Sequence, residues 1–184
     1  MKLNATEIVA VDALVDHLCE QVDNLASDPL RDRYIGFCAV TIATHLETLI
    51  KSVVLDFCDK QNRYLHAVLE ADLAKFNARI RYKALRDLLA RFDTAFEKDF
   101  VRLVNRLNQR RLASGSADIF AAYESLLNTR HSFVHNLNAS FANVTTTDLQ
   151  NYLASGKRVA SAFARSLVAP TSALAPDSGA SDAV

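Results

Sequence analysis

Residues 127–136 contain the side chains of this chain that are best suited to chemistry. Arg130, His131 and His135 lie within six residues of one another. An arginine can hold a phosphate through two parallel hydrogen bonds and does not lose its charge. A histidine ordinarily titrates near neutrality, so it can take a proton from a ribose 2′-hydroxyl or give one to a leaving oxygen. These groups are sufficient to cleave RNA without a metal ion.

The spacing of these side chains limits how they can act together. Arg130 and His135 are five positions apart, which places them about 140° apart around an ideal helix. They can serve one phosphate if the helix frays at His135, or if a second chain supplies the complementary group. Asn136 tolerates the left-handed backbone conformation that often follows a helix, which favours a helix end at this point. His131 and His135 are one turn apart and share a face.

The elements that position this segment are predicted to be helices. Only four glycines occur, and no proline lies between Pro29 and Pro170, whereas a sheet protein of this length needs more turn residues. Apolar residues recur at three- and four-residue steps, with Phe37 on the inner face of the second helix and Val134 on that of the helix before Asn136. The pattern predicts helices over about 5–26, 29–60, 63–76, 77–91, 94–112, 118–136 and 147–165.

The ends of several helices are also predicted. Asp28 followed by Pro29 is typical of a helix start, and Asp93 or Thr94 can cap a later one. Residues 114–116, Ser-Gly-Ser, mark a break, after which Ser116 or Asp118 can cap the helix that contains the motif. Thr146 or Thr147 can cap the last helix. The predicted fold is an all-α, single-domain bundle of five to seven helices over residues 1–168, followed by a disordered Pro/Ser/Ala-rich tail over residues 169–184.

Composition excludes several classes of protein. The 21 basic and 21 acidic side chains cancel, which argues against a general nucleic-acid coat protein but leaves room for a local basic groove. The three cysteines form no Cys-x-x-Cys motif, so a zinc ribbon is excluded and buried reduced thiols are expected. No apolar run approaches the roughly 20 residues of a membrane span, and the first residues do not resemble a secretory signal. We therefore expect a cytoplasmic protein with no membrane partner.

A basic stripe gives a second candidate site. Four of its members are four residues apart and hence on one helix face, namely Lys98, Arg102, Arg106 and Arg110, and Arg111 joins them. Such a stripe can follow an RNA backbone electrostatically. Interspersed carboxylates, such as Glu97 and Asp99, equally suit an ordinary solvated face.

The motif and two earlier segments resemble the HEPN family, in particular its RiboL-PSP-like group. Arg130-x4-His135, late in a helix, is similar to the Arg-x4–6-His motif of that family, and His131 fits the polar position after the arginine. The segments Thr-His-Leu-Glu-Thr-Leu-Ile at 44–50 and Ile-Arg-Tyr-Lys-Ala-Leu at 80–85 are also similar. The resemblance spans about residues 30–165. It departs from the family at Asn136, commonly glycine, and at Leu137, where toxins paired with a nucleotidyltransferase antitoxin have a tyrosine.

The resemblance implies a metal-independent endoribonuclease, without a cofactor, whose two motifs face each other across a homodimer. Arg130 would hold the scissile phosphate, His135 would be general base or acid, and His131 would support it. Glu47, which corresponds to an acidic residue that often lies near the motif, and Asn136 would contact the substrate. The resemblance also implies RNA as substrate, and a toxin–antitoxin or phage-defence setting with an antitoxin or regulatory protein as partner.

Other interpretations of the same residues stay open. Arg130 and His135 can simply complement the dipole at the end of a helix. His131-x3-His135 has the spacing of a zinc site, but Ser132 stands where a catalytic glutamate would be and no third ligand is near in the sequence. The chain as a whole can instead be a non-catalytic helical module that binds a nucleotide or a protein, or an adaptor that binds another chain through apolar helices.

Overall fold

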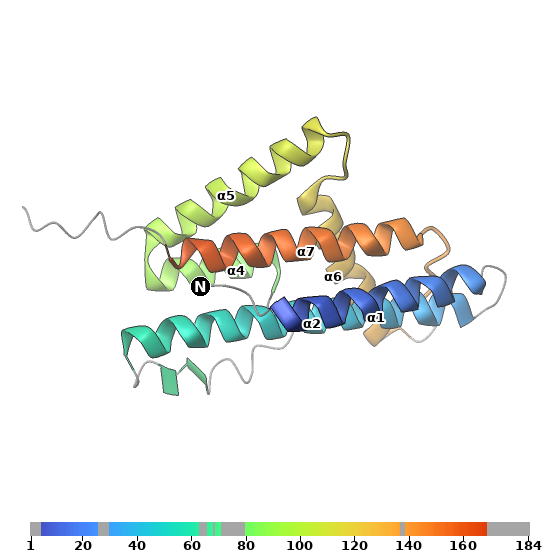
Figure 1. The fold of residues 1–184 in the computed structure, drawn as a ribbon, viewed down its shortest axis with the longest axis horizontal. Coiled ribbons are helices and arrows are strands. Elements are labelled where there is room, and N and C mark those ends of the chain that lie inside the picture. Colours follow the sequence, from blue (N-terminus) through green and yellow to red (C-terminus); the bar gives the residue numbers. More distant parts are fainter. Residues whose placement is uncertain are drawn as a thin grey trace, which may run out of the picture.

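Helices make up nearly all of the structure (Figure 1). The computed structural model describes residues 5–25, 30–62, 66–67, 69–70, 80–136 and 139–168. Its long helices are α1 (Ala5–Asn24), α2 (Leu30–Gln61), α4 (Tyr82–Phe92), α5 (Thr94–Ala113), α6 (Ile119–His135) and α7 (Thr146–Ser166). The predicted all-α bundle of five to seven helices is confirmed.

Helix α7 is the centre of the bundle. It packs against α1, α2, α5 and α6, while α4 packs against α5 (Figure 1). Gly156 allows a close approach here, because a Cβ at this position would lie 2.3 Å from Leu46 Cδ1 of α2. A helix-interior glycine ordinarily weakens a helix by about 1 kcal/mol relative to alanine, and here its small size permits the contact between α2 and α7.

Edge-to-face aromatic pairs join the helices around this centre. Phe100 of α5 meets Phe163 of α7 with ring centroids 5.9 Å apart, and Tyr82 of α4 meets Phe120 of α6 at 5.0 Å. Such pairs add about 0.5–1.5 kcal/mol each beyond the burial of their surface. The three cysteines are free and buried, as predicted.

Helix α2 differs from the sequence prediction, which expected no apolar run long enough to cross a membrane. By length and composition alone, α2 is long and apolar enough to cross one, so that expectation was too strict. Within the described residues, 56% of its apolar window is buried by the rest of the fold. Its contacts with α1, α6 and α7 are those of a core helix.

Several predicted boundaries shift. The predicted helix over 77–91 begins only at Tyr82, because Ile80 and Arg81 are not helical. The Tyr123 hydroxyl donates to the Ile80 carbonyl at 2.6 Å, and the Arg81 guanidinium binds Glu124 at 2.5 Å, so tertiary contacts with α6 hold this turn open. The last helix is capped by Thr145 rather than by either of the next two threonines.

Other predictions fall partly or wholly on residues outside the described ranges. The Asp28–Pro29 helix start and the tail over 169–184 lie there, as does most of the helix predicted over 63–76. Within that last segment, residues 66–67 and 69–70 are described, and they are helical.

Candidate functional site

The N-terminus of α6, the helix that contains the motif, is fixed by a cap that α5 supports. The Asp118 side chain accepts from the Ala121 N–H at 2.9 Å and from the Asn108 amide at 2.8 Å. The Asn108 side-chain oxygen in turn accepts from the buried Ile119 N–H at 2.7 Å. The Asn108 amide, together with the Ala121 N–H, holds the pKa of the Asp118 carboxyl below its usual value. This network confirms Asp118 as the predicted cap and ties the start of α6 to α5.

The C-terminal end of α6 is fixed by close packing against α2. A Cβ on Gly36 would lie 2.0 Å from Cδ2 of the Phe133 ring, so only a glycine allows this contact. The helix stays intact through His135, and the Asn136 N–H donates to the Ser132 carbonyl at 2.9 Å. Asn136 has an extended backbone, with φ −134°, rather than the left-handed one considered from the sequence. The helix therefore does not fray at His135.

Arg130 faces α2, where it meets a buried carboxylate. Its Nη2 lies 3.6 Å from Oε1 of Glu47, with side chains 21% and 9% exposed respectively. This separation is an ion pair rather than a close hydrogen bond. The Arg130 Nε is buried and has no acceptor among the described residues. Glu47 thus compensates the charge of the guanidinium but leaves the Nε donor unused.

His131 and His135 lie on a different face of α6. Their rings are 4.5 Å apart between centroids, and both residues are exposed. The predicted shared face of the two histidines is confirmed. Arg130 lies beside Glu47, whereas the ring of His131 lies beside that of His135. Because α6 is unbroken, Arg130 and His135 keep the angular separation of about 140° that an ideal helix gives to positions five apart. Arg130 and His135 therefore do not share a face of α6 within one chain.

Two apolar side chains near the motif were predicted to face inward, and this was wrong. Phe37 is 52% exposed and Val134 is 53% exposed. Each adjoins a residue of the tight α2–α6 contact, Phe37 next to Gly36 and Val134 next to Phe133. The motif is therefore flanked by exposed apolar surface. No signal in the sequence could have separated these positions from their buried neighbours.

The basic stripe on α5 lies elsewhere. Its four evenly spaced members, Lys98, Arg102, Arg106 and Arg110, are all exposed, and Arg102 pairs with Asp99 at 2.7 Å. Helix α5 meets the start of α6, and from Asp118 to the motif α6 extends about 18–25 Å at 1.5 Å per residue. The structure therefore does not bring Arg102, Arg106 or Arg110 to the Arg130–His135 segment of the same chain.

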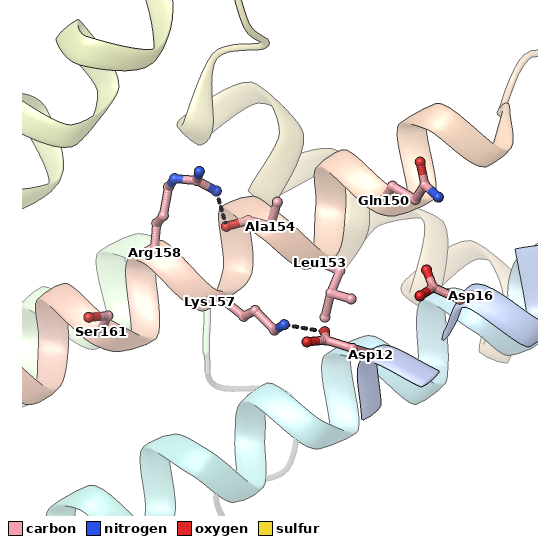
Figure 2. A pocket seen from close by; sticks show the side chains of 8 residues that line it. All are labelled: Asp12, Asp16, Gln150, Leu153, Ala154, Lys157, Arg158 and Ser161. Carbon is pink, nitrogen blue, oxygen red and sulfur yellow. Dashed lines mark hydrogen bonds and ion pairs between the residues drawn. The ribbon is translucent and has the colours of Figure 1, made fainter. Parts of the chain in front are cut away.

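A hollow of about 620 Å³ lies between α1 and α7, away from the motif (Figure 2). Lys157 forms an ion pair with Asp12 across it, and Arg158 lines its other side. Within the described ranges, no three His, Cys, Asp or Glu side chains are grouped so that they could hold a metal ion.

Comparison with known proteins adds one match. The family model described as RiboL-PSP-HEPN matches residues 7–169. Neither the search of curated proteins nor that of solved structures found a match. Domains of this wider family are often ribonucleases, so a role in RNA or nucleotide chemistry follows at the level of the family.

Proposed function

Because this chain belongs to the RiboL-PSP-HEPN family, we propose that it is a metal-independent endoribonuclease that acts as a homodimer. The observation that supports this most is the division of the motif between two faces of α6. Arg130 is held by Glu47 against α2, whereas His131 and His135 are exposed. A second copy that presents the same surface can bring the arginine of one chain to the histidine of the other.

The chemistry follows from the two side-chain types. His135 of one protomer takes the proton of the ribose 2′-hydroxyl, whose oxygen attacks the adjacent phosphorus. Arg130 donates to the phosphate oxygens and stabilises their developing charge. The bond from phosphorus to the 5′-oxygen breaks, and that oxygen takes a proton from an imidazolium. The products are a 2′,3′-cyclic phosphate and a 5′-hydroxyl.

His131 has a supporting role in this scheme. Its ring lies one turn from that of His135, at 4.5 Å between centroids. From there it can orient the His135 ring or act as the second proton carrier, since cleavage needs one group to accept a proton and one to donate a proton.

The exposed apolar residues next to the motif support the homodimer. Phe37 and Val134 are both more than half exposed and flank the contact between Gly36 and Phe133. Burying large apolar side chains stabilises an association, and in a two-fold dimer one patch meets its own copy. The same association would place the two copies of His135, the residue after Val134, near the dimer axis.

The setting is also a proposal. On the basis of its family the enzyme would act in the cytoplasm as a toxin or phage-defence effector, held in check by an antitoxin or another regulatory protein. The second candidate is a non-catalytic module that binds a nucleotide. The charge of Arg130 favours it too, because a guanidinium group can bind any phosphate.

Cleavage in the presence of a chelator separates the two candidates. Purified wild type should cleave single-stranded RNA in excess EDTA and leave cyclic phosphate ends. Arg130→Ala and His135→Ala should each lose at least about a hundredfold in rate, while Arg91→Ala, an exposed arginine on α4, should not. Intact RNA with a folded, dimeric wild type would favour the nucleotide-binding module.

A further inference from the structure

Two guanidinium groups from different helices lie over the same turns of α7. Arg111 of α5 donates from Nη2 to the Asn151 side chain at 3.1 Å and from Nε to the Ala117 carbonyl at 3.0 Å. Arg158 of α7 reaches back to the Ala154 carbonyl at 2.8 Å. Asn151, Ala154 and Arg158 share one face of α7, because they are three and four residues apart. The two arginines are thereby held near each other at the α5–α7 contact.

The two positive charges are not compensated by protein carboxylates. All three acceptors named above are neutral oxygens, and within the described part of the chain neither arginine forms an ion pair. Lys157 forms an ion pair with Asp12, and Figure 2 shows the Arg158 guanidinium directed toward the Ala154 carbonyl and not toward Asp12. Burial, together with the nearby charge of Arg111, lowers the pKa of Arg158 below its ordinary value. Both side chains are half-buried, where like charges repel more strongly than in water.

An anion is the ligand that relieves such a repulsion. Guanidinium groups bind phosphate oxygens through paired, charge-assisted hydrogen bonds. The contacts that hold Arg111 and Arg158 occupy only part of their donors, since a guanidinium has five N–H groups. A phosphate at this position would receive hydrogen bonds from both helices, from Arg111 of α5 and from Arg158 of α7.

We propose that Arg111 and Arg158 form a phosphate site that binds the backbone of the RNA substrate, apart from the Arg130–His135 motif. The phosphate chemistry comes from the arginine pair, and the choice of RNA rests on the function proposed above. The stripe on α5 favours RNA over a small anion. From Lys98 to Arg110 it extends about 18 Å along the helix, and its four evenly spaced members are exposed. An extended polyanion can contact such a surface over its whole length, and a free phosphate cannot.

Binding of RNA to the cleavage-inactive His135→Ala chain tests the site. A fluorescently labelled single-stranded oligonucleotide is titrated at several salt concentrations with Arg111→Gln, Arg158→Gln and Arg158→Lys added to that chain. The control is Arg165→Gln, an exposed arginine in the last turn of the same α7. Each glutamine variant should bind about three- to tenfold more weakly, with a salt slope shallower by about 0.7 per lost phosphate contact. Arg158→Lys should be intermediate and the control unchanged.

Inorganic phosphate separates the two sources of the ligand. If the site holds RNA, phosphate should compete with the oligonucleotide only at high concentration and only in chains that keep both arginines. If phosphate raises the melting temperature of the parent but not of Arg158→Gln, and all variants bind RNA equally, the site binds a small phosphate and the assignment to RNA is overturned. Equal behaviour of all variants toward both probes would overturn the site itself.

The result can be told apart from failure of the proposed function. If the wild type cleaves no RNA, but RNA binding depends on Arg111 and Arg158, the ribonuclease is refuted and this site is supported. A wild type that cleaves, beside glutamine variants that bind RNA as strongly as Arg165→Gln, would support the ribonuclease and refute this site. Circular dichroism melts of each variant show that the chain is folded in either case.

Discussion

Replacing Gly36 by alanine should separate α2 from α6 at the point that fixes the motif. The new Cβ would lie 2.0 Å from Cδ2 and 2.3 Å from Cγ of the Phe133 ring. Carbon atoms in contact are ordinarily about 3.5–4.0 Å apart, so about 1.5 Å of overlap has to be relieved. Cγ is the root of a rigid ring and cannot swing aside alone, so either the whole side chain or one helix must move.

The magnitude follows from two opposing effects. Overpacking of this kind costs about 1–3 kcal/mol, whereas replacing a helix-interior glycine by alanine gains about 1 kcal/mol of helix propensity. The large overlap places the cost in the upper part of that range, about 2–3 kcal/mol, so Gly36→Ala should lower the free energy of unfolding by about 1–2 kcal/mol. In a Phe133→Ala background the clash is gone and only the propensity remains, so the same change should stabilise by up to about 1 kcal/mol. The sign of the effect reverses between the two backgrounds.

Urea denaturation of the wild type, the two single variants Gly36→Ala and Phe133→Ala, and the double variant measures this double-mutant cycle. A coupling energy of about 2 kcal/mol between positions 36 and 133 is expected. Gly156→Ala is the comparison: its Cβ would lie 2.3 Å from Leu46 Cδ1, the end of a flexible side chain, so it should cost less than Gly36→Ala. A Gly36→Ala chain as stable as wild type, or one destabilised equally with and without Phe133, would refute the close contact that positions the end of α6.

Three further predictions concern the supports of the motif. Glu47→Gln removes the carboxylate 3.6 Å from Arg130, so it should lower the unfolding free energy by about 1–2 kcal/mol and the rate of RNA cleavage by about tenfold. Glu47→Asp should lie between wild type and Glu47→Gln. Unchanged or faster cleavage by Glu47→Gln would contradict a positioning role. Tyr123→Phe leaves the Ile80 carbonyl without its 2.6 Å donor in the core, so urea denaturation should show a loss of about 1–3 kcal/mol, and equal stability would mean that the hydrogen bond is not formed. The pKa of Asp118 is lower in the folded chain than in the unfolded one, so its contribution is present above about pH 4 and is lost as the pH falls through the folded value. In urea denaturation, Asp118→Asn should thus have a lower free energy of unfolding than the wild type at pH 7, and the two values should converge below pH 4. A difference in free energy that stays constant between pH 7 and pH 4 would contradict this account.

The local features of the fold could be predicted from the sequence because short-range chemistry determines them. Asp93 and Asp118 cap α5 and α6 through contacts within three residues, which a sequence pattern can identify. The i, i+4 spacing likewise predicted the shared face of His131 and His135. Three consecutive threonines made the cap of α7 ambiguous, and the capping box with Asp148 selects Thr145, the first of them.

The remaining features depend on tertiary contacts that periodicity does not encode. Ile80 and Arg81 leave the helical pattern because α6 supplies Tyr123 and Glu124 as partners. Phe37 has an apolar side chain at a helical spacing, yet the packing of the helices around α2 leaves it 52% exposed. The Glu47–Arg130 pair joins residues 83 positions apart in the chain, so the resemblance to a family suggested it but spacing could not.

Mixing two inactive chains tests the composite site most directly. Arg130→Ala and His135→Ala homodimers each lack one half of the motif. If Arg130 and His135 of different chains form the site, a heterodimer regains one of its two arginine–histidine combinations. With free exchange of equal amounts, half of the dimers are heterodimers, so the mixture should recover about a quarter of wild-type cleavage. A mixture that stays inactive, although native mass spectrometry shows that heterodimers have formed, would contradict a site shared between two chains.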